Sequence, residues 1–225
     1  PMTEFNLSRR LVAEGVGTAV LLAAIVGSGI MAERLAGDNG ALVLLANMAA
    51  TGAILAVLIL VFGAISGAHF NPAVSLVFYL RREIAGADGL AYGAVQLVGA
   101  LAGVALAHAM FGEPILQAAV KARHEPGMWL GEIVATAGLA MTILACVRWR
   151  PEATPYAVGL FISAGYWFTS STSFANPAVT VARAFTDSFT GIRLADAPAF
   201  IAAQLIGAVL AALLFRWLEA GEPES

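Results

Sequence analysis

Two copies of one short stretch decide the fold: Asn71-Pro72-Ala73-Val74 in the first half of the chain and Asn176-Pro177-Ala178-Val179 in the second. In each copy the Asn stands where a helix N-cap is expected, and its side-chain oxygen can accept a hydrogen bond from a backbone N–H of the first turn. Pro suits the first helical position because it has no N–H to lose. One copy alone indicates no more than a capped helix start in a loop, but two copies require a further explanation.

The two stretches belong to a longer internal repeat. Each is preceded by a Glu-x3-Thr pair and followed by a Gln-x2-Gly pair, in the same order and at comparable separations. The landmarks are Glu14, Thr18, Gln96, Gly99 and Gly103 in the first half, and Glu132, Thr136, Gln204, Gly207 and Ala211 in the second. We therefore predict one membrane domain over 1–225, with repeat 1 at about 9–110 and repeat 2 at about 128–218.

The composition indicates that most of the surface faces lipid. Of the 225 residues, 60% are hydrophobic and 12% are charged, whereas soluble domains carry about 25% charged residues. Stretches of roughly 20 apolar residues can cross a hydrocarbon core of about 30 Å. Six stretches qualify: Leu11–Met31, Ala41–Ala64, Leu90–Met110, Trp129–Val147, Pro155–Thr172 and Pro198–Leu218. The net charge of -3 gives no sign of a nucleic-acid partner, and we expect no cofactor and no metal.

Two further segments, Asn71–Tyr79 and Asn176–Phe185, are too short to span and are predicted to be re-entrant half-helices. Because each repeat holds three spans, the second copy is inverted, and such repeats place the functional site near the bilayer midplane. Helix N-termini carry partial positive charge, so the Asn71 and Asn176 amides are expected to donate into a lumen there. Backbone carbonyls of the preceding loops are candidate rungs for a solute: Gly67, Ala68, His69, Thr172, Ser173 and Phe174.

The distribution of cations predicts the orientation. With the N-terminus in the cytoplasm, seven Lys and Arg residues lie inside and five outside, a weak excess that follows the positive-inside rule. We expect a multi-pass protein of the cell's inner (plasma) membrane with both termini cytoplasmic.

The stretch Ser66-Gly67-Ala68-His69-Phe70-Asn71-Pro72-Ala73-Val74 resembles the first signature of the aquaporin (major intrinsic protein) family, and the likeness extends from Arg10 to Leu218. The second signature matches at Asn176-Pro177-Ala178 and then departs, because Val179 stands where the family usually has Arg. The resemblance implies an all-α fold of six spanning helices and two half-helices, and a homotetramer with one pore per subunit.

Four positions transfer by spacing from the family's outer constriction: Thr51, Ala164, Ser173 and Val179. All four side chains are small, and the loss of Arg removes a permanent charge and five donors. We therefore expect a wide constriction, and we do not expect a channel that conducts water alone. The segment from Ala182 to Ile192 is similar to a bacterial subgroup associated with arsenic resistance.

These observations predict a passive channel, not an enzyme, for small uncharged solutes such as arsenous and antimonous acid, with glycerol and water as further permeants. Three alternatives stay open: a water- or glycerol-selective aquaporin; a proton-coupled transporter that uses Glu14 or Glu132; and an intramembrane hydrolase with Ser66 and His69 as nucleophile and base. The hydrolase lacks an acidic orienter and leaves the repeat unexplained.

Several buried polar residues are interpreted as supports for the loops. Glu14 and Glu132 are expected to accept hydrogen bonds from loop donors that would otherwise be unsatisfied. Gln96 and Gln204 are expected to brace the half-helices, and His69 to be held by a buried Glu. Arg183 lies two helical turns after Asn176, where it either reaches the outer vestibule or pairs with Asp187 at i+4.

Overall fold

The computed structural model describes residues 5–220, and every regular element in that range is helical. The α-helices are α1 (Leu7–Ala36), α2 (Gly40–Ser66), α3 (Pro72–Leu80), α4 (Gly86–Phe111), α5 (Pro126–Trp149), α6 (Thr154–Phe168), α7 (Pro177–Ala182) and α8 (Ala197–Glu219). Short 3-10 turns occur at Pro151–Ala153, Arg183–Phe185 and Leu194–Asp196. The predicted all-α membrane fold of six helices and two half-helices is confirmed.

Five of the helices, α1, α2, α4, α5 and α8, are long and apolar enough to cross a membrane. The helix α6 has only 15 residues, about 22 Å at 1.5 Å per residue. The prediction of a helical span as far as Thr172 is therefore wrong at its end. The backbone of Thr169 is extended, with φ -108° and ψ 137°, and the chain leaves the helix there to return toward Asn176.

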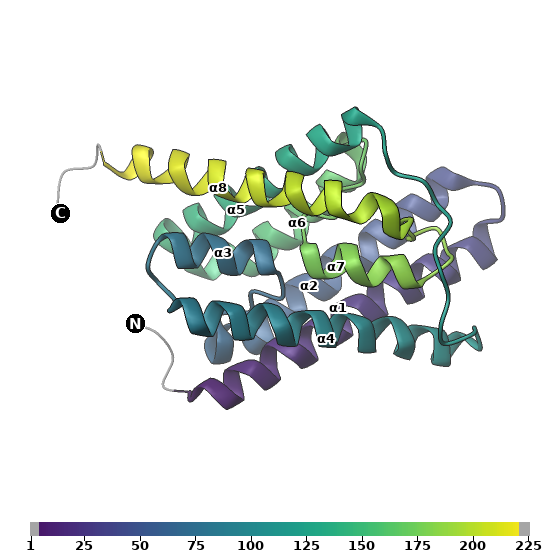
Figure 1. The fold of residues 1–225 in the computed structure, drawn as a ribbon, viewed down its shortest axis with the longest axis horizontal. Coiled ribbons are helices and arrows are strands. Elements are labelled where there is room, and N and C mark those ends of the chain that lie inside the picture. The colour runs from purple at the N-terminus through teal and green to yellow at the C-terminus, as the bar shows by residue number, and fades with distance from the viewer. Residues whose placement is uncertain (1–4, 221–225) are drawn as a thin grey trace.

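The two half-helices lie end to end between α4 and α8, with their N-termini directed toward each other (Figure 1). The capping chemistry expected from the sequence sets both starts. Asn71 Oδ1 accepts from the Ala73 N–H at 2.9 Å, and Asn176 Oδ1 accepts from the Ala178 N–H at 3.0 Å. Pro follows each Asn at the first helical position.

Helix contacts in the two halves of the chain match. In the first half α1 packs against α2 and α4, and in the second half α5 packs against α6 and α8. Contacts between α2 and α6, α3 and α8, and α4 and α7 join the halves. The start of α1 and the end of α8 lie at the same end of the bundle (Figure 1).

Small residues bring equivalent helix pairs into backbone contact. A Cβ added at Gly99 on α4 would lie 2.2 Å from the carbonyl oxygen of Gly15 on α1. At the equivalent position on α8, a Cβ at Gly207 would lie 2.5 Å from the carbonyl oxygen of Ile133 on α5. In lipid, where apolar side chains gain little by leaving the solvent, such close packing is a main source of helix association.

Substitution of Gly99 by Leu should therefore prevent the correct docking of α4 on α1. A matched control is Gly93→Leu on the same helix, because a Cβ at Gly93 meets no atom within 4 Å. We expect the Gly99 variant to lose monodisperse protein in detergent gel filtration and the Gly93 variant to behave as the wild type. Equal yields of both variants would contradict the close contact.

Candidate channel site

The loop before each half-helix adopts a conformation that side chains normally avoid. In the first loop Gly67, Ala68 and Phe70 have φ of 86°, 51° and 48°, and the second loop repeats this pattern at Thr172, Ser173 and Ala175 with 64°, 52° and 48°. Left-handed backbone costs a residue with a side chain about 1–2 kcal/mol. Five such residues in two short loops need a strong external constraint.

In the first loop the carboxyl group of Glu14 on α1 supplies that constraint. Its oxygens accept from the N–H groups of His69 at 2.9 Å and Phe70 at 2.7 Å. They also accept from Ser66 Oγ at 2.6 Å and Gln96 Nε2 at 2.8 Å. Glu14 is fully buried, and these four donors occupy the acceptor positions that a carboxylate offers.

Glu132 on α5 makes the equivalent contacts with the second loop. It accepts from the N–H groups of Phe174 and Ala175, both at 2.8 Å, and from Gln204 Nε2 at 2.6 Å. Gln204 Nε2 also donates to Thr180 Oγ1 on α7 at 2.8 Å. In the first half, Gln96 Nε2 similarly reaches Ser75 Oγ on α3 at 3.2 Å, so each glutamine ties a carboxyl group to a half-helix.

The two Asn side chains cross-link the loops at the meeting point of the half-helices. Asn71 Nδ2 donates to the Ala175 carbonyl at 2.7 Å, and Asn176 Nδ2 donates to the Phe70 carbonyl at 2.8 Å. An amide NH₂ has two hydrogens, so one N–H of each Asn is used in this link and the second is not. The carbonyls of Phe70 and Ala175 are consequently occupied by protein donors.

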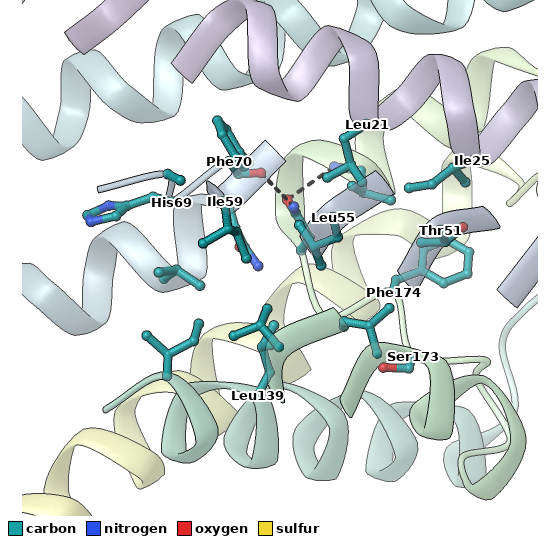
Figure 2. Close-up of a pocket in the computed structure, with 18 of the residues that line it drawn as sticks. Leu21, Ile25, Thr51, Leu55, Ile59, His69, Phe70, Leu139, Ser173 and Phe174 are labelled. Carbon is teal, nitrogen blue, oxygen red and sulfur yellow. Dashed lines mark hydrogen bonds between the residues drawn. The ribbon is translucent and has the colours of Figure 1, made fainter. Parts of the chain in front are cut away.

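A narrow cavity with a volume of about 90 Å³ passes the paired Asn side chains. Figure 2 shows His69, Ile59 and Phe70 toward one end and Thr51, Ser173 and Phe174 toward the other, with Leu21 and Leu55 between them. Of the six residues expected to offer carbonyl rungs, Gly67, Ala68, His69, Ser173 and Phe174 line the cavity, whereas Thr172 lies outside it. The cavity is small compared with ligand pockets of about 300–1,000 Å³, so it has room only for small molecules.

Three of the four residues assigned to the outer constriction line the cavity: Thr51, Ser173 and Val179. The assignment of Ala164 is wrong. Ala164 lies on the exposed face of α6, because the residues of that helix that line the cavity recur every fourth position, at Thr154, Val158, Ile162 and Tyr166. Tyr166 lines this region instead, and its hydroxyl lies 3.2 Å from Thr51 Oγ1.

The hydrolase alternative finds no support in the geometry. Ser66 Oγ donates to Glu14, while the His69 ring Nδ1 lies 3.0 Å from Ser75 Oγ and the ring stacks on Phe78 at 4.6 Å. Within residues 5–220, no hydrogen bond joins Ser66 to the His69 ring, so a nucleophile–base pair is not formed. The backbone N–H of His69, and not its ring, binds the buried Glu14.

The chain matches the major intrinsic protein family over residues 2–165 and 145–223. It belongs to that family. Aquaglyceroporin AqpS from Rhizobium meliloti (strain 1021) is 57% identical over 217 residues, which cover 96% of this chain and 93% of the relative. A probable aquaporin from Oryza sativa subsp. japonica, TIP3-2, is 32% identical over 224 residues, covering 96% of this chain and 84% of the relative.

A solved structure of the aquaglyceroporin from Plasmodium falciparum has the same fold, with a TM-score of 0.75, 21% identity, and coverage of 93% of this chain and 96% of that one. Major intrinsic proteins are channels, so this chain is an integral multi-pass membrane channel and not an enzyme.

Sequence reasoning missed Arg123 in the long loop of this major intrinsic protein. Its Nη1 donates to the Ser171 carbonyl at 3.1 Å and its Nε to the Gly191 carbonyl at 2.9 Å. Burial lowers the pKa of Arg123 to about 10. In the first half, the Tyr92 hydroxyl caps the equivalent Ser66 carbonyl at 2.8 Å. The carbonyl of Ser171 is thus bound by the guanidinium of Arg123, whereas the equivalent carbonyl of Ser66 is bound by the hydroxyl of Tyr92. The internal repeat of the sequence does not predict this difference.

Replacement of Glu132 by Gln should release the second loop. The isosteric amide presents one acceptor oxygen and one NH₂, so it can serve only one of the two loop N–H groups, and an unpaired buried donor costs about 1–3 kcal/mol. We expect a lower melting temperature in detergent and loss of water flux in stopped-flow measurements. Glu152→Gln, in the exposed turn before α6, is the control, and equal behaviour of the two variants would contradict the role of Glu132.

Proposed function

We propose that the chain is a passive channel for small uncharged hydroxylated solutes, including metalloid hydroxides such as arsenous and antimonous acid, with glycerol and water as further permeants. The observation that carries this proposal is the meeting of Asn71 and Asn176 on one cavity, at the starts of two oppositely directed half-helices. This meeting supports the proposal because donors and the positive ends of two helices come together at one point of the proposed path.

The electrostatics of the meeting point favour neutral solutes. Both half-helix N-termini carry partial positive charge, and a cation that has lost its water shell is repelled there. A neutral hydroxyl can accept from the free N–H of Asn71 or Asn176 and donate to carbonyls of the loops. Irregular backbone is tolerated at membrane depth where it lines a water-filled path, which is the role we assign to Gly67, Ala68, His69, Ser173 and Phe174.

The nature of the outer constriction supports solutes larger than water. Thr51, Ser173 and Val179 are small side chains that line this end, and Val179 replaces the Arg usual in the family. Tyr166 contributes an aromatic ring to the lining, whereas the sequence predicts four small side chains there. The constriction is therefore narrower than the sequence predicts. We assign the selectivity filter to these four residues, with Tyr166 in place of Ala164.

Two relatives support the solute class by their names: AqpS is an aquaglyceroporin, and so is the Plasmodium falciparum structure that shares the fold. The metalloid assignment rests on Val179 and on the likeness of residues 182–192 to the arsenic-associated subgroup. A strictly water- or glycerol-selective channel is the competing function.

Proton-coupled transport is disfavoured by the state of the two buried acids. Neither Glu14 nor Glu132 lines the cavity, and Glu14 already accepts four hydrogen bonds. A relay needs an acid that can exchange protons with the path, whereas both acids accept hydrogen bonds from the backbone N–H groups of the loops.

For assembly and location, we propose the family's homotetramer with one pore per subunit, in the inner membrane of the cell, with both termini in the cytoplasm. At the end of α8, Glu219 pairs with Arg81 and Arg148, and Arg82 and Arg150 lie close to these two residues in the chain, just after α3 and α5. This excess of Arg follows the positive-inside rule.

A solute panel in proteoliposomes tests the function. Vesicles containing the protein are exposed to gradients of glycerol, urea and arsenous acid, and water flux is measured on the same preparation. We expect glycerol and arsenous acid to enter faster than in protein-free vesicles, with proton current at the background level. Water flux alone would favour the strict water channel, and a large proton current without solute flux would contradict the proposal.

Substitution of Val179 by Arg should narrow the outer constriction. We expect glycerol permeability to fall about tenfold, equivalent to about 1.4 kcal/mol on the barrier, and water permeability to fall less because water is smaller. Ala164→Trp is the control: it adds bulk on the exposed face of α6 and should leave both fluxes unchanged. Unchanged or raised glycerol flux in the Val179 variant would show that the filter is misassigned.

A further inference from the structure

Arg183 lies at the outer end of the cavity, directly after α7. Its side chain is 1% exposed and lines the cavity together with Val179 and Ser173. Arg183 follows Val179 by one helical turn, so both residues face the same side. The guanidinium is thus displaced outward by one turn from the position where the family usually carries its Arg.

Two contacts hold the guanidinium in place. Its Nε donates to the Thr190 carbonyl, and its central carbon lies 3.4 Å from the centroid of the Phe174 ring. The backbone around it is also fixed, since Ile192 N–H donates to the Arg183 carbonyl at 3.2 Å and Ala119 N–H to the Ala184 carbonyl at 3.0 Å. The expected ion pair with Asp187 is absent between the described residues, and the Asp187 carboxyl instead accepts from Val120 N–H at 3.5 Å.

Within residues 5–220, the hydrogen bond of the Arg183 side chain is made by Nε, and the two terminal nitrogens are not among the enclosed polar atoms that lack a partner. The Ser173 hydroxyl, which also lines the cavity, is 2% exposed and has no partner among these residues. Buried polar groups are normally satisfied. Arg183 and Ser173 line the same cavity, and the terminal nitrogens of the guanidinium can donate to the oxygen of a passing solute or water.

The charge around Arg183 is not neutralised by a nearby ion pair. The groups that interact with it electrostatically are Arg123, Lys121, Tyr166 and Glu132, and Glu132 is engaged with the second loop. Burial lowers the pKa of Lys121 to about 8, and the charges of Arg123 and Arg183 contribute to this. Among the described residues that line the cavity, Arg183 is the one with a permanent charge.

We propose that Arg183 is the specificity-determining cation of this channel, positioned by Phe174 and Thr190, and that with Ser173 it binds a solute oxygen and excludes cations at the outer end. The proposal rests on the proposed channel function and adds a residue to it. In this interpretation the cation usual at the position of Val179 is found one turn further along, at Arg183. The constriction at Val179 is wider as a result, and cations are still excluded by the charge of Arg183.

The ratio of guanidinium to glycerol permeability in proteoliposomes tests the proposal, because guanidinium stays charged at all accessible pH values. We expect Arg183→Gln to raise this ratio by about tenfold, since a unit charge on a partly desolvated wall acts strongly on a nearby cation. Arg34→Gln is the charge-matched control: Arg34 lies at the same end of the bundle in an exposed pair with Glu113 and outside the cavity lining. An unchanged ratio in Arg183→Gln, or an equal rise in Arg34→Gln, would overturn the role of Arg183.

A second variant keeps the proposal testable should Arg183→Gln fail to fold. Arg183→Lys retains a cation, but a buried Lys among other cations loses its proton at a lowered pH. We expect guanidinium exclusion in this variant to weaken between about pH 6 and about pH 9, relative to the wild type, which carries the same Lys121 and serves as control. Identical pH profiles would contradict the proposal, and a wild type without any glycerol flux would contradict the channel function as well.

Discussion

The structure depends on hydrogen bonds between two buried carboxyl groups and the two loops that enter the membrane. Without Glu14 and Glu132, the loop N–H groups would be unsatisfied in a medium that offers no water, and the left-handed backbone at Ala68, Phe70, Ser173 and Ala175 would relax. Because the loops are held open in this way, the half-helices start at mid-bundle instead of at its surface. The path for solutes depends on this constraint. The buried carboxyl groups bind the N–H groups on one side of each loop, and this leaves the carbonyls on the other side free to face the path.

The two halves of the molecule support each other through contacts that cross the repeat. Asn71 reaches the Ala175 carbonyl and Asn176 reaches the Phe70 carbonyl, so neither half-helix is positioned by its own repeat alone. Glycine contacts at Gly99 and Gly207 bring α4 and α8 close enough to α1 and α5 for Gln96 and Gln204 to reach the carboxyl groups. Small residues in the spans, buried acids and paired Asn side chains are thus parts of one arrangement, which explains why they recur together in the sequence.

The sequence was sufficient for the features that depend on local chemistry and on the repeat. Asn-Pro-Ala predicts a capped helix start from backbone physics, and duplication around Glu14 and Glu132 predicts which residues approach the loops. The prediction from the sequence fails for Ala164, because this position is assigned by counting residues from Asn176 across the end of a helix. Ala164 was placed by its distance from Asn176, but α6 ends at Phe168 and the extended segment that follows changes the register. A period of four at Thr154, Val158, Ile162 and Tyr166 could have identified the inward face. The partners of Arg183 and Arg123 depend on how two distant loops meet, which no local pattern encodes.

Passive conduction past the paired asparagines is the central claim, and accumulation under an imposed pH gradient tests it most directly. Proteoliposomes with a pH difference across the membrane are incubated with labelled glycerol until uptake stops. Passive conduction predicts that internal and external glycerol become equal, in either direction of the pH gradient, because Glu14 and Glu132 do not exchange protons with the path. Glycerol held above the external concentration while the pH gradient persists would contradict the account.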